Sequence, residues 1–111
     1  MIKYVVIPER REVVAMINDT AYSAIERIEK LCNKYFPENS VGVFPIYTKY
    51  KMPYRFKAIA KCHPSDEWDE EVGKQVAREK VLNNYYNSLD KRVEEFVNDL
   101  SHSTMKLLEN Y

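Results

Sequence analysis

The stretch Tyr54–Gly73, YRFKAIAKCHPSDEWDEEVG, contains a strand, a stop and a helix start in immediate succession. Side chains alternate along its first nine residues with the period of two that is typical of a strand with one buried and one wet face. The expected buried face holds Tyr54, Phe56, Ala58, Ala60 and Cys62, and the expected wet face holds Arg55, Lys57, Ile59 and Lys61. The stretch therefore predicts a strand whose exposed face is a basic stripe.

Pro64 ends this predicted strand, because proline has no backbone N–H to donate and keeps the preceding residue extended. A helix start follows directly, with Ser65 or Asp66 as the capping side chain and five acidic residues within 66–71, where the helix dipole is positive. Gly73 falls in the second turn, where glycine costs roughly 1 kcal/mol relative to alanine. That cost predicts a close approach of the helix backbone to the sheet.

Two β-rich runs near the N-terminus, residues 2–7 (IKYVVI) and 12–17 (EVVAMI), predict a hairpin whose turn runs from Pro8 to Arg11. A rival interpretation makes Pro8 the first residue of one long helix that continues to Phe36, since proline is welcome at that position. The clustered valines and isoleucines favour the hairpin.

Apolar residues at spacings of three and four predict a helix that begins near 18–20 or at Ser23, ends near Tyr35, and lays one apolar stripe on a sheet. Ser40 to Tyr50, SVGVFPIYTKY, predicts a further strand, and its internal proline suits an edge or a bulge. The expected order is ββαββα. We therefore expect an α+β domain, with a small antiparallel sheet, helices on one face and a long C-terminal helix.

Residues 69–111 contain no proline and one glycine, which predicts a long C-terminal helical segment after a core formed by 1–68. Trp68, Val72 and Val76 are expected to pack on the sheet. Later apolar residues follow a spacing close to a heptad: Tyr86, Leu89, Val93, Phe96, Leu100 and Leu107. Such a seam needs a partner, which it finds either by folding back at 83–88 or, as we favour, by pairing in a homo-oligomer.

The composition fits a single domain, 1–111, with 45% hydrophobic residues. The chain has no apolar run that could span a membrane and no cleavable N-terminal signal pattern, so we expect a cytoplasmic location and no membrane partner. Cys32 and Cys62 lack CxxC spacing and a histidine set, which predicts free thiols and no metal site. Residues 1–63 carry eleven Lys and Arg against six acids, and residues 64–111 carry six against eleven. The two halves, or two copies, should attract one another.

Catalytic motifs are missing from the sequence: it contains no GxSxG, P-loop, HExxH or nucleotide-binding glycine fingerprint. His63 and Asp66 are candidates for acid–base chemistry, although a strand stop and a helix cap explain them as well. We expect no enzyme activity and no cofactor. Zero net charge disfavours extended nucleic acid as a partner, because sequence-independent binding to it requires many cationic contacts.

Anion binding is the chemistry that the residues favour, although an ordinary solvated sheet face would show the same composition. Arginine suits phosphate because its planar fork donates two parallel hydrogen bonds. Aromatic rings, of which there are nine tyrosines and four phenylalanines besides Trp68, offer surfaces on which a base can stack. The candidate ligand-binding residues are Arg10, Arg11, Tyr54, Arg55, Lys57, Lys61 and Trp68.

The pattern FKAIAKCHPSDEWDEEVGKQVAREK, residues 56–80, resembles a motif of small phage and prophage proteins, and the chain from Ile2 to Asn84 is similar to the Thoeris anti-defence protein 1 family. The resemblance implies an oligomeric sponge that binds and sequesters a cyclic ADP-ribose isomer, such as glycocyclic ADP-ribose, without degrading it. Its place of action would be the infected bacterial cell. The alternative is a phage accessory module that binds RNA or a host protein through the basic sheet face or the long helix.

Overall fold

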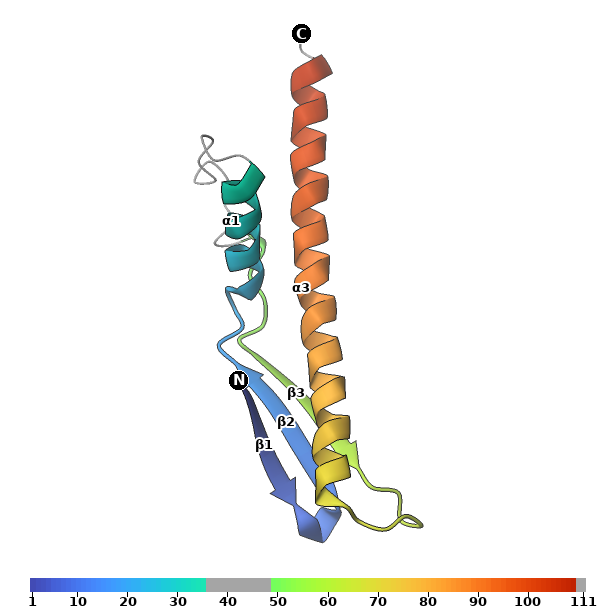
Figure 1. Ribbon diagram of the computed structural model, residues 1–111. Coiled ribbons are helices and arrows are strands. Elements are labelled where there is room, and N and C mark those ends of the chain that lie inside the picture. The colour runs from blue at the N-terminus through green and yellow to red at the C-terminus, as the bar shows by residue number, and fades with distance from the viewer. Residues whose placement is uncertain (36–48, 110–111) are drawn as a thin grey trace. The chain divides into compact units, whose positions relative to one another are not determined.

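The computed structural model describes residues 1–35 and 49–109, and it divides into two compact units. The first unit comprises Met1–Thr20 and Pro53–Asn87, and the second comprises Ala21–Met52 and Ser88–Tyr111. In chain order the elements are β1 (Ile2–Ile7), a 3-10 turn (Pro8–Arg10), β2 (Glu12–Asn18), α1 (Ser23–Tyr35), β3 (Arg55–Lys61) and α3 (Glu70–Glu109), as Figure 1 shows. The fold is α+β, with a three-stranded antiparallel sheet in the order β1-β2-β3 and a long C-terminal helix packed on it.

The predicted N-terminal hairpin is confirmed, and the alternative of one long helix from Pro8 is wrong. Pro8 opens a 3-10 turn of three residues, and Arg11 then takes the left-handed conformation (φ 54°, ψ 46°) that returns the chain into β2. Asp19, with φ 62°, ends β2, so the following helix begins at Ser23 rather than at 18–20. The predicted strand from Ser40 to Tyr50 lies outside the described residues, apart from Lys49 and Tyr50, which are not in a strand.

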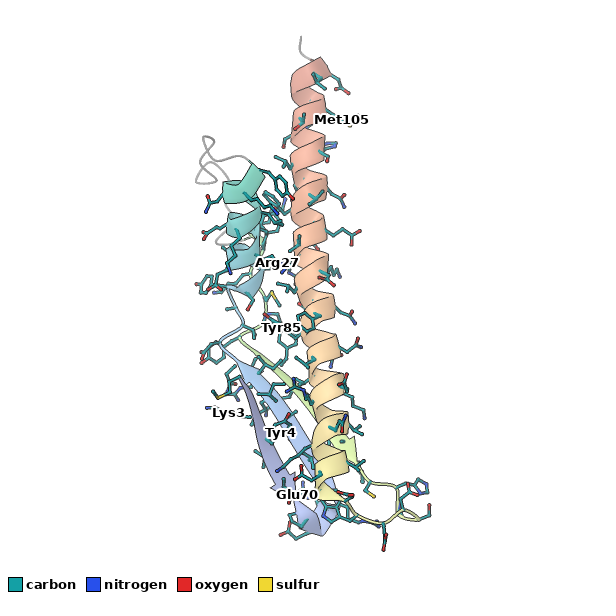
Figure 2. The ribbon with its side chains drawn as sticks, viewed as in Figure 1. Lys3, Tyr4, Arg27, Glu70, Tyr85 and Met105 are labelled. Atoms are coloured by element: carbon teal, nitrogen blue, oxygen red, sulfur yellow. The ribbon has the colours of Figure 1, made fainter. Side chains whose placement is uncertain are left out.

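The core of the first unit lies between one face of the sheet and the first turns of α3. Small side chains dominate it, which lets the helix approach the strands closely. Its buried members are Val13, Ala15, Ile17, Ala58, Ala60, Ala77 and Val81. At its margin the rings of Phe56 and Tyr85 meet edge to face with centroids 5.7 Å apart, and Figure 2 shows Tyr85 on the part of α3 beside the sheet.

Two predictions about the start of α3 need correction. The cap is Asp69 rather than Ser65 or Asp66, because the Asp69 carboxylate accepts hydrogen bonds from the amides of Glu71 (3.0 Å) and Val72 (3.3 Å). Val72 and Val76 do not pack on the sheet, and they remain 57% and 41% exposed. The residues that face the sheet are Gly73, Ala77 and Val81.

The second unit has a core of its own, which covers the apolar seam of α3. The stripe of α1 was expected to lie on the sheet, yet Ile25, Ile28 and Cys32 cluster with Tyr50 and Phe96. The rings of Tyr50 and Phe96 meet edge to face at 5.6 Å. Leu89 is also buried, and Val93 and Leu100 pack at the margin of the cluster, whereas Tyr86 is exposed. The helix continues without a break through 83–88, so it does not fold back there.

Candidate functional site

The sheet has an open face, on the side away from α3, on which the predicted basic stripe of β3 lies. Cross-strand pairing sets Lys57 opposite Met16, which in turn is opposite Lys3. In the next row of the same face, Ile59, Val14 and Val5 follow one another across the three strands. The open face therefore has an apolar row, with Val5 44% and Ile59 52% exposed, and cations around it.

Two of the cations on the open face contact neighbouring side chains. Arg55 donates a hydrogen bond from Nε to Oδ1 of Asn18 at 2.6 Å, and Lys61 forms an ion pair with Glu12 at 3.9 Å. The Arg55–Asn18 hydrogen bond is exposed, and the Lys61 side chain is 70% exposed in a long ion pair, so neither contact holds its cation firmly. These cations therefore remain accessible to an anionic partner.

Tyr54 precedes β3 and is exposed. Its hydroxyl is hydrogen-bonded to the Asp19 carboxylate, which raises the pKa of Tyr54 above its ordinary value. Its carbonyl accepts a hydrogen bond from the Thr20 amide at 3.0 Å. Tyr54 therefore helps to join β3 to the end of β2, and it is not among the residues that line the pocket described below.

The two arginines of the hairpin turn have different surroundings. Arg10 is exposed, whereas the guanidinium of Arg11 reaches the loop after β3. It donates hydrogen bonds to the carbonyls of Pro64, at 3.2 Å, and of Asp66, and Nη2 lies 3.4 Å from Sγ of Cys62. Arg11 therefore fixes a loop, which is a structural role that the sequence did not indicate.

A pocket of about 440 Å³ lies where this loop meets the start of α3. Its size falls within the range of small-molecule sites. The lining residues include an aromatic residue, Trp68, the exposed Val72 and Val76, a lysine, a histidine and three acidic residues. The residues are Ala60, Lys61, Cys62, His63, Asp66, Glu67, Trp68, Asp69, Val72, Gly73 and Val76. We call this the Trp68 pocket.

The imidazole of His63 is oriented by its own loop. The Ser65 amide donates to Nδ1 at 3.2 Å, and Oγ of Ser65 lies 2.6 Å from the same nitrogen. Because Nδ1 accepts the amide hydrogen bond, the proton of the neutral ring lies on Nε2. His63 therefore has a hydrogen-bond donor on the nitrogen that its loop leaves free.

The structure brings together only part of the predicted site. Arg55 and Lys57 lie on the open face, Trp68 lines the pocket, and Lys61 contributes to both. Sequence reasoning missed Val72 and Val76 as lining residues because their spacing looked like a buried stripe. The face of α3 that contacts the sheet could have been found from the small residues one position later, Gly73 and Ala77, because they permit a closer approach to the strands.

Among residues 1–35 and 49–109, no group of three or more His, Cys, Asp or Glu side chains is arranged to hold a metal ion. Cys32 and Cys62 are free thiols, and burial raises the pKa of Cys32. None of the described helices is both long and apolar enough to cross a membrane.

Comparison of the chain with protein-family models, with curated proteins and with solved structures finds no match.

Proposed function

We propose that this chain is a non-enzymatic binding protein that sequesters a nucleotide of the cyclic ADP-ribose type in the Trp68 pocket. The observation that carries the proposal is the composition of this pocket, which combines an aromatic ring, two exposed valines, a lysine, a histidine and three carboxylates in about 440 Å³. Together these groups match the base, the diphosphate and the ribose of a nucleotide.

The apolar part of the pocket suits the base, because a purine ring stacks on tryptophan and packs against aliphatic side chains. The Nε2–H of His63 is a donor for the diphosphate, and the Lys61 ammonium, which in this structure pairs with Glu12 on the open face, would reach the ligand from the end of β3. Asp66, Glu67 and Asp69 can accept hydrogen bonds from ribose hydroxyls, as acidic residues do in dinucleotide-binding sites.

The resemblance to the Thoeris anti-defence protein 1 family supports the same proposal, since the stretch from Ile2 to Asn84, over which it extends, includes every residue of the pocket lining. A sponge must hold its ligand below the concentration at which the signal acts. We expect a Kd on the order of nanomolar, or about −12 kcal/mol. A concave pocket reaches that affinity more readily than a flat surface patch does.

The test is a calorimetric titration with cyclic ADP-ribose isomers, followed by heating of the complex and chromatography of the released ligand. The proposal predicts tight binding and recovery of intact ligand. Lys61→Ala should weaken binding without unfolding the chain, because this side chain is 70% exposed. Arg55→Ala is the matched control, since it removes a cation of β3 outside the pocket. Failure of every isomer to bind would reject the sponge, and recovery of a cleaved product would show an enzyme.

A second candidate function is docking of an acidic protein partner on the open face. The row Val5, Val14 and Ile59 with cations around it has the apolar centre and polar rim of a protein interface. Among the described residues this face presents no aromatic ring on which a base could stack, which favours a protein over RNA. Ile59→Asp should abolish capture of such a partner from a host lysate and leave nucleotide binding unchanged. Capture that falls steeply with salt and is removed by nuclease would show RNA instead.

A further inference from the structure

The three-stranded sheet has two edges, β1 and β3, and they differ in how they are protected. An exposed edge offers unpaired N–H and C=O groups to another chain, and proteins commonly protect such edges with charged side chains. β3 carries three cations, and the Lys80 ammonium donates to the carbonyl of Ile59 at 3.2 Å. β1, with the sequence IKYVVI, carries one charged side chain, Lys3. Within the described sheet, β1 is therefore the edge with little protection.

The hydrogen bonds between the strands determine which β1 groups point outward. The Cys62 amide donates to the Arg11 carbonyl at 2.9 Å, and hydrogen-bonded pairs alternate along an antiparallel ladder. The register therefore directs the backbone of Val13, Ala15 and Ile17 toward β3, and the residues between them toward β1. On β1, the residues whose backbone groups face away from β2 are Ile2, Tyr4 and Val6.

We propose that this outer edge of β1 pairs antiparallel with β1 of a second copy of the chain. A two-fold register centred on Tyr4 sets Tyr4 opposite Tyr4 and Ile2 opposite Val6. All three outward-facing residues then fall in hydrogen-bonded pairs, and each pair exchanges two backbone hydrogen bonds. A register centred on Lys3 or Val5 leaves one of these residues without a partner. The two sheets of three strands would join into one continuous sheet.

Side chains favour the same register on both faces of the joined sheet. Tyr4, Ile2 and Val6 are half-buried against the core, and each would meet an apolar residue of the second copy. On the open face, Lys3 would lie opposite Val5, so the two lysines avoid each other. Figure 2 shows Lys3 and Tyr4 on opposite sides of β1. The pairing thus adds apolar contacts without opposing like charges.

The first test is a charge swap at Val5, whose side chain is 44% exposed and so tolerates substitution. Val5→Lys places two lysine pairs across the interface and should weaken dimerisation on the order of tenfold, as measured by analytical ultracentrifugation. Val5→Glu should keep or tighten the dimer. The double variant Lys3→Glu with Val5→Lys restores opposite charges and should recover it. Equal effects of Val5→Lys and Val5→Glu would overturn the proposed register.

The second test is a disulfide cross-link in a Cys32→Ser, Cys62→Ser background. Lys3 and Val5 form non-hydrogen-bonded pairs in the proposed register, where Cα atoms approach to about 4.5 Å, within the range of a disulfide. Mixing Lys3→Cys protein with Val5→Cys protein should give a covalent heterodimer, and each variant alone should cross-link poorly. Tight nucleotide binding by a monomeric chain would overturn the pairing of β1 and leave the proposed sponge intact. A dimer that binds no nucleotide would support the pairing and reject the sponge. A monomeric mass of the unmodified chain by light scattering at every concentration would overturn it.

Discussion

Gly73 of α3 lies so close to Val13 of β2 that a Cβ added to the glycine would be 2.8 Å from Cγ2 of the valine. The same Cβ would lie 3.5 Å from Cη2 of Trp68. Val13 is fully buried, so its side chain has little room to move. This contact explains a glycine in a helical turn and sets how closely α3 approaches the sheet.

Gly73→Ala should therefore destabilise the protein despite the better helix propensity of alanine. Propensity contributes a gain of about 1 kcal/mol, whereas overpacking in a core costs about 1–3 kcal/mol, and we expect a net loss on the order of 1 kcal/mol. In a Val13→Ala background the obstructing methyl groups are gone, so the same substitution should stabilise. Urea midpoints of the four proteins measure the sign in each background. Stabilisation in both backgrounds would contradict the close contact.

The cap of α3 gives a second prediction. Asp69→Ala removes the acceptor of two amide hydrogen bonds and should lower the free energy of unfolding by about 1 kcal/mol. Asp69→Ser should retain most of this stability, because serine also caps. Ser65→Ala is the matched control at one of the two positions, Ser65 or Asp66, that the sequence offered as the cap, and it should change stability by less than about 0.5 kcal/mol. Thermal or urea unfolding of the three variants decides between the two caps.

The wrongly predicted cap of α3 shows which features the sequence alone could not predict. The strand β3 and the N-terminal hairpin were predictable because alternation and proline act locally. Three capping side chains compete after Pro64, and the close packing of Gly73 against Val13 is tertiary, so local preference could not choose among them. Hydrophobic patterns also give little weight to small residues. They favoured Val72 and Val76 as the buried face of α3, when the close approach required the glycine and alanine beside them.

The apolar seam of α3 was recognised, but what covers it was not. Leu89, Val93, Phe96 and Leu100 have the spacing of a buried face, and the sequence offered a second copy as the natural cover. In the structure α1 and Tyr50 cover Phe96, through contacts between residues far apart in the chain. The predicted ligand-binding residues lie at different places in the structure for the same reason. Residue types indicate which chemistry is possible, but long-range contacts decide which residues lie together.

The Arg11 guanidinium gives a third prediction. Arg11→Ala loses its contacts to the loop and retains the left-handed backbone, so we expect a loss of about 1–2 kcal/mol. Arg11→Gly loses the same contacts but relieves the backbone strain, so its stability should fall between those of Arg11→Ala and the unmodified chain. Arg10→Ala, at the exposed neighbouring residue, should have little effect. A glycine variant more stable than the unmodified chain would show that the loop contacts contribute little.

Tyr50 gives the last prediction, which concerns alkaline pH. Its side chain is buried, and its hydroxyl donates a hydrogen bond to the Asp99 carboxylate, which also pairs with Lys49 at 2.7 Å. Burial, this hydrogen bond and the nearby carboxylates raise the pKa of Tyr50 well above its ordinary value. Hydrogen bonds from Lys49 and Tyr50 hold the pKa of Asp99 below its usual range.

The sign of the pH effect follows from these directions. Below about pH 10, the ordinary pKa of tyrosine, Tyr50 is protonated in both the folded and the unfolded chain, and its contribution is fully present. Above that pH the unfolded chain releases the proton while the folded chain retains it. Stability should therefore fall by up to about 1.4 kcal/mol per pH unit until the folded pKa is reached.

Tyr50→Phe should be less stable than the unmodified chain near pH 8, because it lacks the hydrogen bond, yet its stability should fall less between about pH 10 and 11. Asp99→Asn removes the carboxylate that helps to keep Tyr50 protonated. The fall in its stability between these pH values should therefore be intermediate between that of Tyr50→Phe and that of the unmodified chain. Urea unfolding at the two pH values measures these slopes, and titration of all other tyrosines is common to the three proteins. Parallel pH profiles for all three would show that Tyr50 ionises as readily in the folded chain as in the unfolded one.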